Sequence, residues 1–157
     1  MKGWDRRALE GLPLRLLIMA LLVSLTLPVV LGSMESYERT TARTRLAAEA
    51  ERVGGVIEEV MSAGEGNRRI VTVELPESLA KFSMRLEVGG AIGSAESLTV
   101  RCLEGGAVFR NIVLEDPPAR TTTADGRGMV LEAGMYRLAV ECVRADDRAF
   151  VLVSVSL

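Results

Sequence analysis

The chain has 157 residues, of which 48% are hydrophobic and 25% are charged, and it carries a formal net charge of −2. The near-neutral charge and an aromatic content of only 4% argue against nucleic-acid binding. Histidine is absent, which removes the commonest general base and the commonest metal ligand and makes an enzyme improbable.

Residues 12–31, LPLRLLIMALLVSLTLPVVL, form an apolar stretch in which Arg15 is the only charged residue. A helix of this length rises about 30 Å, the thickness of the hydrocarbon core of a bilayer. We therefore expect a transmembrane helix over 12–31, kinked at Pro28, after a basic cytoplasmic leader over 1–11. The positive-inside rule places the N-terminus in the cytoplasm and the rest of the chain outside, because basic residues flank the start of the span: Lys2, Arg6, Arg7 and Arg15.

A secretory signal removed after Gly32 is the alternative interpretation of this stretch. The apolar run exceeds the usual signal core of roughly 7–15 residues, and no A-x-A cleavage site follows it. A retained membrane helix is therefore the favoured prediction.

Residues 32–63 are predicted to form an amphipathic helical stalk, because they lack proline and are rich in alanine, glutamate and arginine. The stalk either continues the membrane helix or begins again after Gly32, with Ser33 or Ser36 as its cap. Apolar residues recur at spacings of three and four and form a stripe that packs against the protein's own β-domain or against a neighbouring subunit: Ala42, Leu46, Ala50, Val53, Ile57, Val60 and Met61.

From Arg68 the hydrophobic period changes from 3.6 to two, which indicates strands. The expected fold class is α+β: a long N-terminal helix followed by a small antiparallel β-sandwich or barrel of about seven strands over 68–157, outside the membrane. The run 107–114 is apolar on both faces and is expected to be a central strand, whereas 115–128 is a loop by composition. The other strands are expected near 71–75, 82–88, 98–102, 129–132, 136–142 and 150–157.

Cys102 and Cys142 fall on predicted inward faces, where they are either buried free thiols or a disulfide. The absence of C-x-x-C and of histidine argues against zinc. Adjacent carboxylates at Glu58-Glu59, Glu115-Asp116 and Asp146-Asp147 are expected to be solvated, since neighbouring side chains diverge on a helix or strand. No catalytic, cofactor-binding or metal site is predicted.

The layout resembles the type IV pilin-like superfamily, in particular archaeal pilins and archaellum-related surface proteins with a class III signal peptide. The likeness lies in RRALEG at 6–11 followed by LPLRLL at 12–17, in IVTVELP at 70–76 and in GMYRL at 134–138. Glu10 stands where that family usually has a basic residue.

The resemblance implies that a prepilin peptidase cuts between Gly11 and Leu12, or less favourably between Gly3 and Trp4, unless the chain stays uncut. It also implies that the helix joins other pilin-like subunits, or further copies of this chain, in a filament core. The competing hypothesis is a single-pass anchored β-sandwich that binds a surface-layer or secretion-system partner. Both place the protein at the cell membrane, with the lipid bilayer as a partner and no cofactor.

Overall fold

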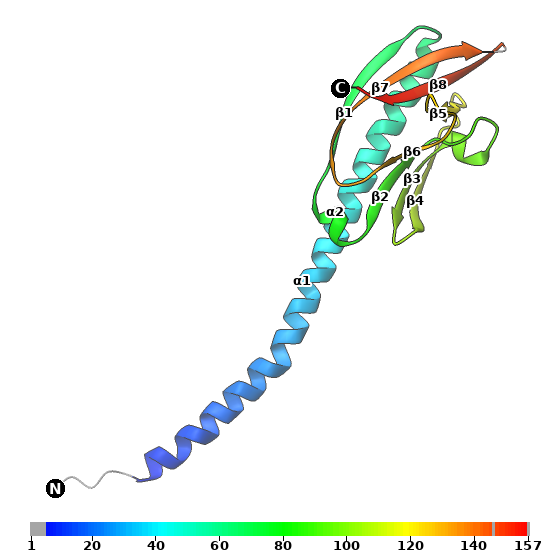
Figure 1. The fold of residues 1–157 in the computed structure, drawn as a ribbon. Coiled ribbons are helices and arrows are strands. Elements are labelled where there is room, and N and C mark those ends of the chain that lie inside the picture. The colour runs from blue at the N-terminus through cyan, green and yellow to red at the C-terminus, as the bar shows by residue number, and fades with distance from the viewer. Residues whose placement is uncertain (1–5, 146, 157) are drawn as a thin grey trace. The chain divides into compact units, whose positions relative to one another are not determined.

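The computed structural model describes residues 6–145 and 147–156, with side chains from residue 14 onward, and divides the chain into two compact units, residues 1–38 and 39–157. One helix, α1 (Arg6–Ala63), is continuous through the boundary (Figure 1). Ser33 does not cap a second helix, because its hydroxyl donates a 2.8 Å hydrogen bond to the carbonyl of Val29 within α1. The alternative of a helix that restarts after Gly32 is therefore wrong.

The end of α1 follows from its local sequence. Gly64 and Gly66 have φ angles of +86° and +81°, a region that favours glycine and reverses the chain. Asn67 caps the helix through its side-chain amide, which donates to the carbonyl of Ala63 at 2.7 Å.

The remainder of the second unit contains eight strands, confirming the α+β class, with two sheets and no closed barrel among the described residues. One sheet has the order β1-β7-β8-β5 and the other the order β4-β3-β2-β6; the β5–β8 pair is parallel and the other pairs are antiparallel. The elements after α1 are β1 (Arg68–Leu75), α2 (Ser78–Lys81), β2 (Met84–Val88), the 3-10 helix η1 (Ala95–Leu98), β3 (Thr99–Glu104), β4 (Ala107–Val113), β5 (Thr121–Thr122), β6 (Met129–Leu131), β7 (Gly134–Ala145) and β8 (Arg148–Val155).

The core of this unit lies between the C-terminal half of α1 and both sheets. Arg52 of α1 donates to the carbonyl of Thr72 on β1, and a Cβ atom added to Gly54 would lie 3.4 Å from Cγ2 of Ile112 on β4. The helix therefore contacts strands of both sheets. The stripe residues Leu46, Val53 and Ile57 are fully buried in this core, and Met61 packs against it half-buried.

Three details differ from the sequence-based expectations. The 107–114 run supplies an edge strand and not a central one, because β4 lies at the end of its sheet order; its outward residues Val108 and Val113 are 49% and 44% exposed. The 115–128 loop contains β5, which pairs with the last strand, β8. Phe82 ends α2 and does not begin β2, since Ser83 has a φ of +51° and interrupts the extended backbone.

Candidate functional site

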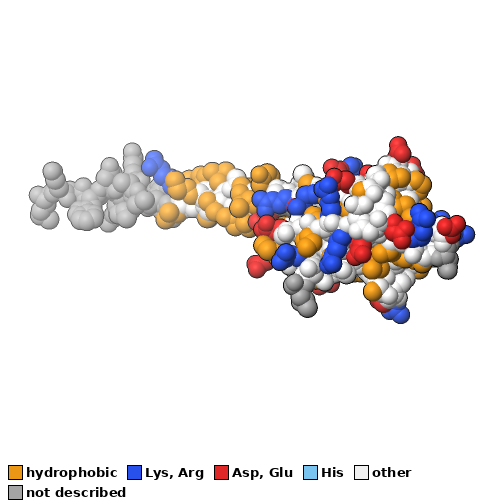
Figure 2. Space-filling model, turned by 90° about the horizontal axis from the view of Figure 1, so that it is seen from above, with side chains coloured by type: hydrophobic (Ala, Val, Ile, Leu, Met, Phe, Trp, Pro, Cys, Tyr) orange, Lys and Arg blue, Asp and Glu red, His pale blue; other side chains and the backbone are white. Residues whose placement is uncertain are grey.

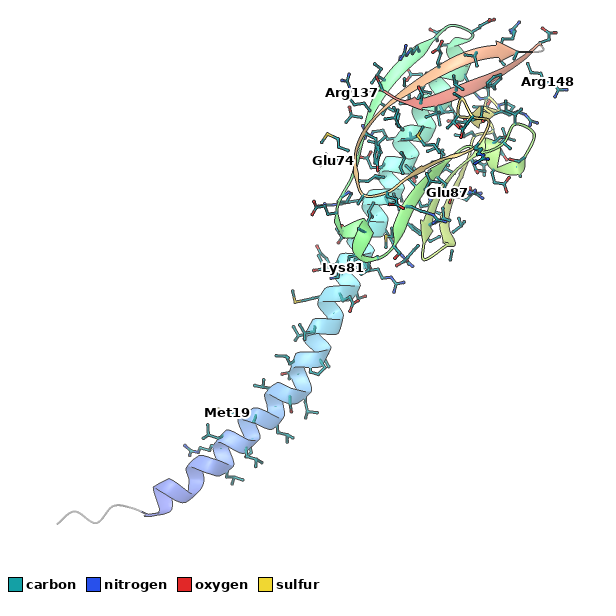
Figure 3. The ribbon with its side chains drawn as sticks, in the orientation of Figure 1. Met19, Glu74, Lys81, Glu87, Arg137 and Arg148 are labelled. Atoms are coloured by element: carbon teal, nitrogen blue, oxygen red, sulfur yellow. The ribbon has the colours of Figure 1, made fainter. Side chains whose placement is uncertain are left out.

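The first unit contains the N-terminal part of α1, whose apolar side chains from Leu14 onward are uncovered. Every residue from 14 to 40 is exposed, and among the large hydrophobic ones the exposed fraction runs from 47% at Ile18 to 74% at Tyr37. Figure 2 shows hydrophobic side chains around this part of the helix, and Figure 3 shows Met19 extending away from the helix. Within the described residues, α1 is the one helix long and apolar enough to cross a membrane.

The uncharged part of this helix matches a bilayer in length. No charged residue lies between Arg15 and Glu35, a separation that rises about 30 Å. Hydroxyl groups in this stretch bond back to the helix: Ser24 donates to the carbonyl of Leu21 at 2.8 Å, and Thr26 donates to that of Leu22 at 2.9 Å. These contacts meet the requirement that polar groups in lipid be satisfied internally.

Small residues and one proline recur at every fourth position along one side of α1: Ala20, Ser24, Pro28, Gly32 and Ser36. A Cβ atom at Gly32 would meet no atom within 4 Å, so the described structure gives no steric reason for glycine there. Glycine costs roughly 1 kcal/mol relative to alanine inside a helix. Small residues at this spacing allow two membrane helices to approach closely.

In the second unit, a charge cluster joins Arg39 and Arg43 of α1 to Glu104 at the end of β3. Both oxygens of Glu104 accept hydrogen bonds: Oε1 from Nε of Arg39 at 2.5 Å and Oε2 from Nε of Arg43 at 2.7 Å. The guanidinium of Arg43 also lies 5.2 Å from the centre of the Phe109 ring. The Glu104 side chain is only 9% exposed, whereas the two arginine side chains are about half exposed.

The pKa of Glu104 predicts an acid-sensitive contribution to stability. Burial raises this pKa, but the hydrogen bonds and charges of Arg39 and Arg43 lower it by more, so it lies below its usual value. A depressed carboxyl pKa gives stability that is complete above the unfolded value, about 4.3, and is lost as the pH falls through the folded value. Acidification below about pH 4.3 should therefore cost the wild type more unfolding free energy than Glu104→Gln. Urea unfolding at two pH values measures this; equal losses in both proteins would contradict it.

Cys102 and Cys142 are buried free thiols, which is one of the two alternatives expected from the sequence. Cys102 donates through Sγ to the carbonyl of Leu46 at 3.8 Å, whereas the backbone of Cys142 bonds to Asn67 beyond the end of α1. The helix rises about 25 Å between Leu46 and Ala63, so the thiols lie far beyond the roughly 7 Å between Cα atoms that a disulfide tolerates. Burial raises the pKa of Cys102 to about 11 and also raises that of Cys142.

The described residues also include a polar pocket, but they contain no cluster of candidate metal ligands. No group of three or more His, Cys, Asp or Glu side chains that could hold a metal ion occurs in the part of the chain described. A shallow pocket of about 310 Å³ between β2, η1 and β6 contains Arg101, but its guanidinium already pairs with Glu87 at 2.9 Å and approaches Glu96 at 4.0 Å.

The residues predicted for processing lie at the limit of the structure. Gly11 and Leu12 are within the backbone of α1, whereas Gly3 and Trp4 fall outside the described residues. The Glu104 cluster was not predicted from the sequence. Its partners lie 65 and 61 residues earlier in the chain, so no local motif could have identified it.

Comparison with known proteins gives one match, to a family described as a domain of unknown function (DUF7311), over residues 13–156. No curated protein and no solved structure matches the chain. The match takes in the apolar helix from Pro13 together with the whole β-domain except its last residue. The chain therefore belongs to the DUF7311 family.

Proposed function

We propose that this protein is a non-enzymatic structural subunit or accessory component of a type IV pilus-like surface filament. Its apolar helix would lie in the membrane before assembly and in the filament core afterwards, with the β-domain outside. The observation that carries the proposal is the exposed apolar surface of α1 from Leu14 to Met34, which no other described segment of the chain covers. An apolar surface of this length needs lipid or other helices around it.

The small-residue side of α1 supports self-association. A helix surrounded by lipid alone gains nothing from glycine at position 32. A second helix can approach closely there, because glycine has no side chain. The basic residues near the N-terminus support an extracytoplasmic β-domain through the positive-inside rule.

The test of the proposal combines the native N-terminus with the location of the protein in its cells. Intact mass of the native protein distinguishes a chain that begins at Leu12 from one that begins at Met1. A filament subunit should begin at Leu12 and appear in the fraction sheared from the cell surface. An intact Met1 start, with all of the protein in the detergent-extracted membrane, would contradict the proposal and favour an anchored binding module.

Substituting Gly32→Leu should reduce self-association in a bilayer several-fold without harming the monomer. The new side chain has open space in the described structure and replaces the residue with the poorer helix propensity, but it would separate two helices packed at this point. Energy transfer between labelled copies in vesicles measures the association.

Val30→Leu is the matched control, because Val30 is 55% exposed and lies off the small-residue side. Equal association of Gly32→Leu, Val30→Leu and wild type would show that the glycine side is not an interface.

A further inference from the structure

Glu104 lies where α1 enters the second unit. Arg39 is the first residue of that unit, and its side chain binds Glu104. The first buried side chain along α1 is Ala42, at 1% exposure, and the first large one is Leu46, at 0%. Between Arg39 and Leu46, the contacts with the β-domain that are described above are the Glu104 cluster and the buried methyl group of Ala42.

The geometry of β3 and β4 sets up this contact. The register between them shifts between Cys102 and Leu103, so Arg110 pairs with Cys102 and Val108 with Leu103. Phe109 has no register partner, and its ring lies beside Arg43. An irregularity of this kind redirects a side chain at a sheet edge.

We propose that Glu104 is a latch that fixes residues 39–45 of α1 to the β-domain, and that releasing it frees this segment while the helix from Leu46 onward stays packed. The observation behind this is that one carboxylate holds both arginines, one on each oxygen, within a stretch that has almost no apolar anchor. The role of the latch in a membrane or filament rests on the proposed function, but the contact of Glu104 with the two arginines does not.

Release would lengthen the free part of α1. Arg39 and Leu46 are separated by about 10 Å of helix rise, or two turns. In a subunit held by its helix in a membrane or filament, the latch therefore sets how freely the β-domain can turn.

The experiment measures exposure of Ala42 in the full chain in detergent micelles. Ala42→Cys places a thiol at a buried site, and its reaction with a maleimide is followed by peptide mass mapping, which separates it from Cys102 and Cys142. Adding Glu104→Gln should accelerate labelling of Ala42→Cys at least about tenfold, because hydrogen bonds to charged groups are the strong ones. The double change Arg39→Gln and Arg43→Gln should have the same effect.

Two controls separate a local latch from a general loss of stability. A second reporter, Ala50→Cys, occupies a site with 0% exposure further along α1 and should stay slow in the Glu104→Gln background. Glu51→Gln breaks an exposed ion pair to Arg110 and should leave Ala42→Cys slow. No acceleration at Ala42→Cys, or equal acceleration at both reporters, would overturn the latch. Micelles hold no filament, so the outcome is independent of whether the protein forms one.

Discussion

Replacing Leu22 and Leu25 together with arginine is expected to release the protein from the membrane fraction. Both side chains lie near the middle of the uncharged stretch and are exposed, at 56% and 63%. Arginine at the centre of a membrane helix costs roughly 3 kcal/mol, so the pair costs about 6 kcal/mol before the lost leucine contribution is added. Carbonate extraction of membranes followed by immunodetection measures the retained fraction.

The matched control is methionine at the same two positions, which keeps an apolar side chain of similar size and should leave the protein in the membrane. The β-domain of the arginine variant should still fold, because its core begins at Ala42 and includes neither substituted residue. If the folded arginine variant remained in the carbonate-resistant pellet, α1 would not be a membrane span.

Gly89→Ala is expected to destabilise the second unit by about 3–5 kcal/mol, which combines the cost of a left-handed backbone with that of overpacking. Gly89 has a φ of +68°, and a Cβ atom there would lie 2.3 Å from the carbonyl oxygen of Thr121. Because Thr121 belongs to β5 and Gly89 directly follows β2, this contact joins the two sheets. Urea unfolding of the detergent-solubilised protein, followed by circular dichroism, gives the change in free energy.

Gly126→Ala provides the comparison, since Gly126 also has a positive φ, +74°, but a Cβ atom there meets nothing within 4 Å. Gly126→Ala should lower the unfolding free energy by about 1–2 kcal/mol, which is the effect of the left-handed backbone conformation alone. Equal losses of unfolding free energy in the two variants would show that the backbone near Thr121 shifts to accept a Cβ atom at Gly89, and that this contact does not hold the sheets together.

The residues of α1 illustrate what can be predicted from sequence. Spacings of three and four identified the stripe that includes Leu46, Val53 and Ile57, and the structure buries all three. The hydrophobic periodicity does not identify the segment that covers the stripe. It indicates only that some apolar surface packs against that face of the helix. The structure places the stripe in one core with side chains of both sheets.

The strands were also only partly predictable from the sequence. Alternation located most of them, but it missed β5 and assigned the 107–114 run to the middle of a sheet. Strand order depends on pairings between distant residues, such as Thr121 with Val151, and the alternation within one strand does not specify its neighbour.

The sequence alone determined the class of the fold, the extent of the apolar helix and the inward faces of most strands. These features depend on the composition and period of single segments, which local physics decides. Only the tertiary structure decided that α1 contacts both sheets, that the cysteines lie far apart and that Glu104 holds Arg39 and Arg43. Those contacts join residues up to 65 positions apart, and their partners become neighbours only when the two sheets and the helix enclose a common core.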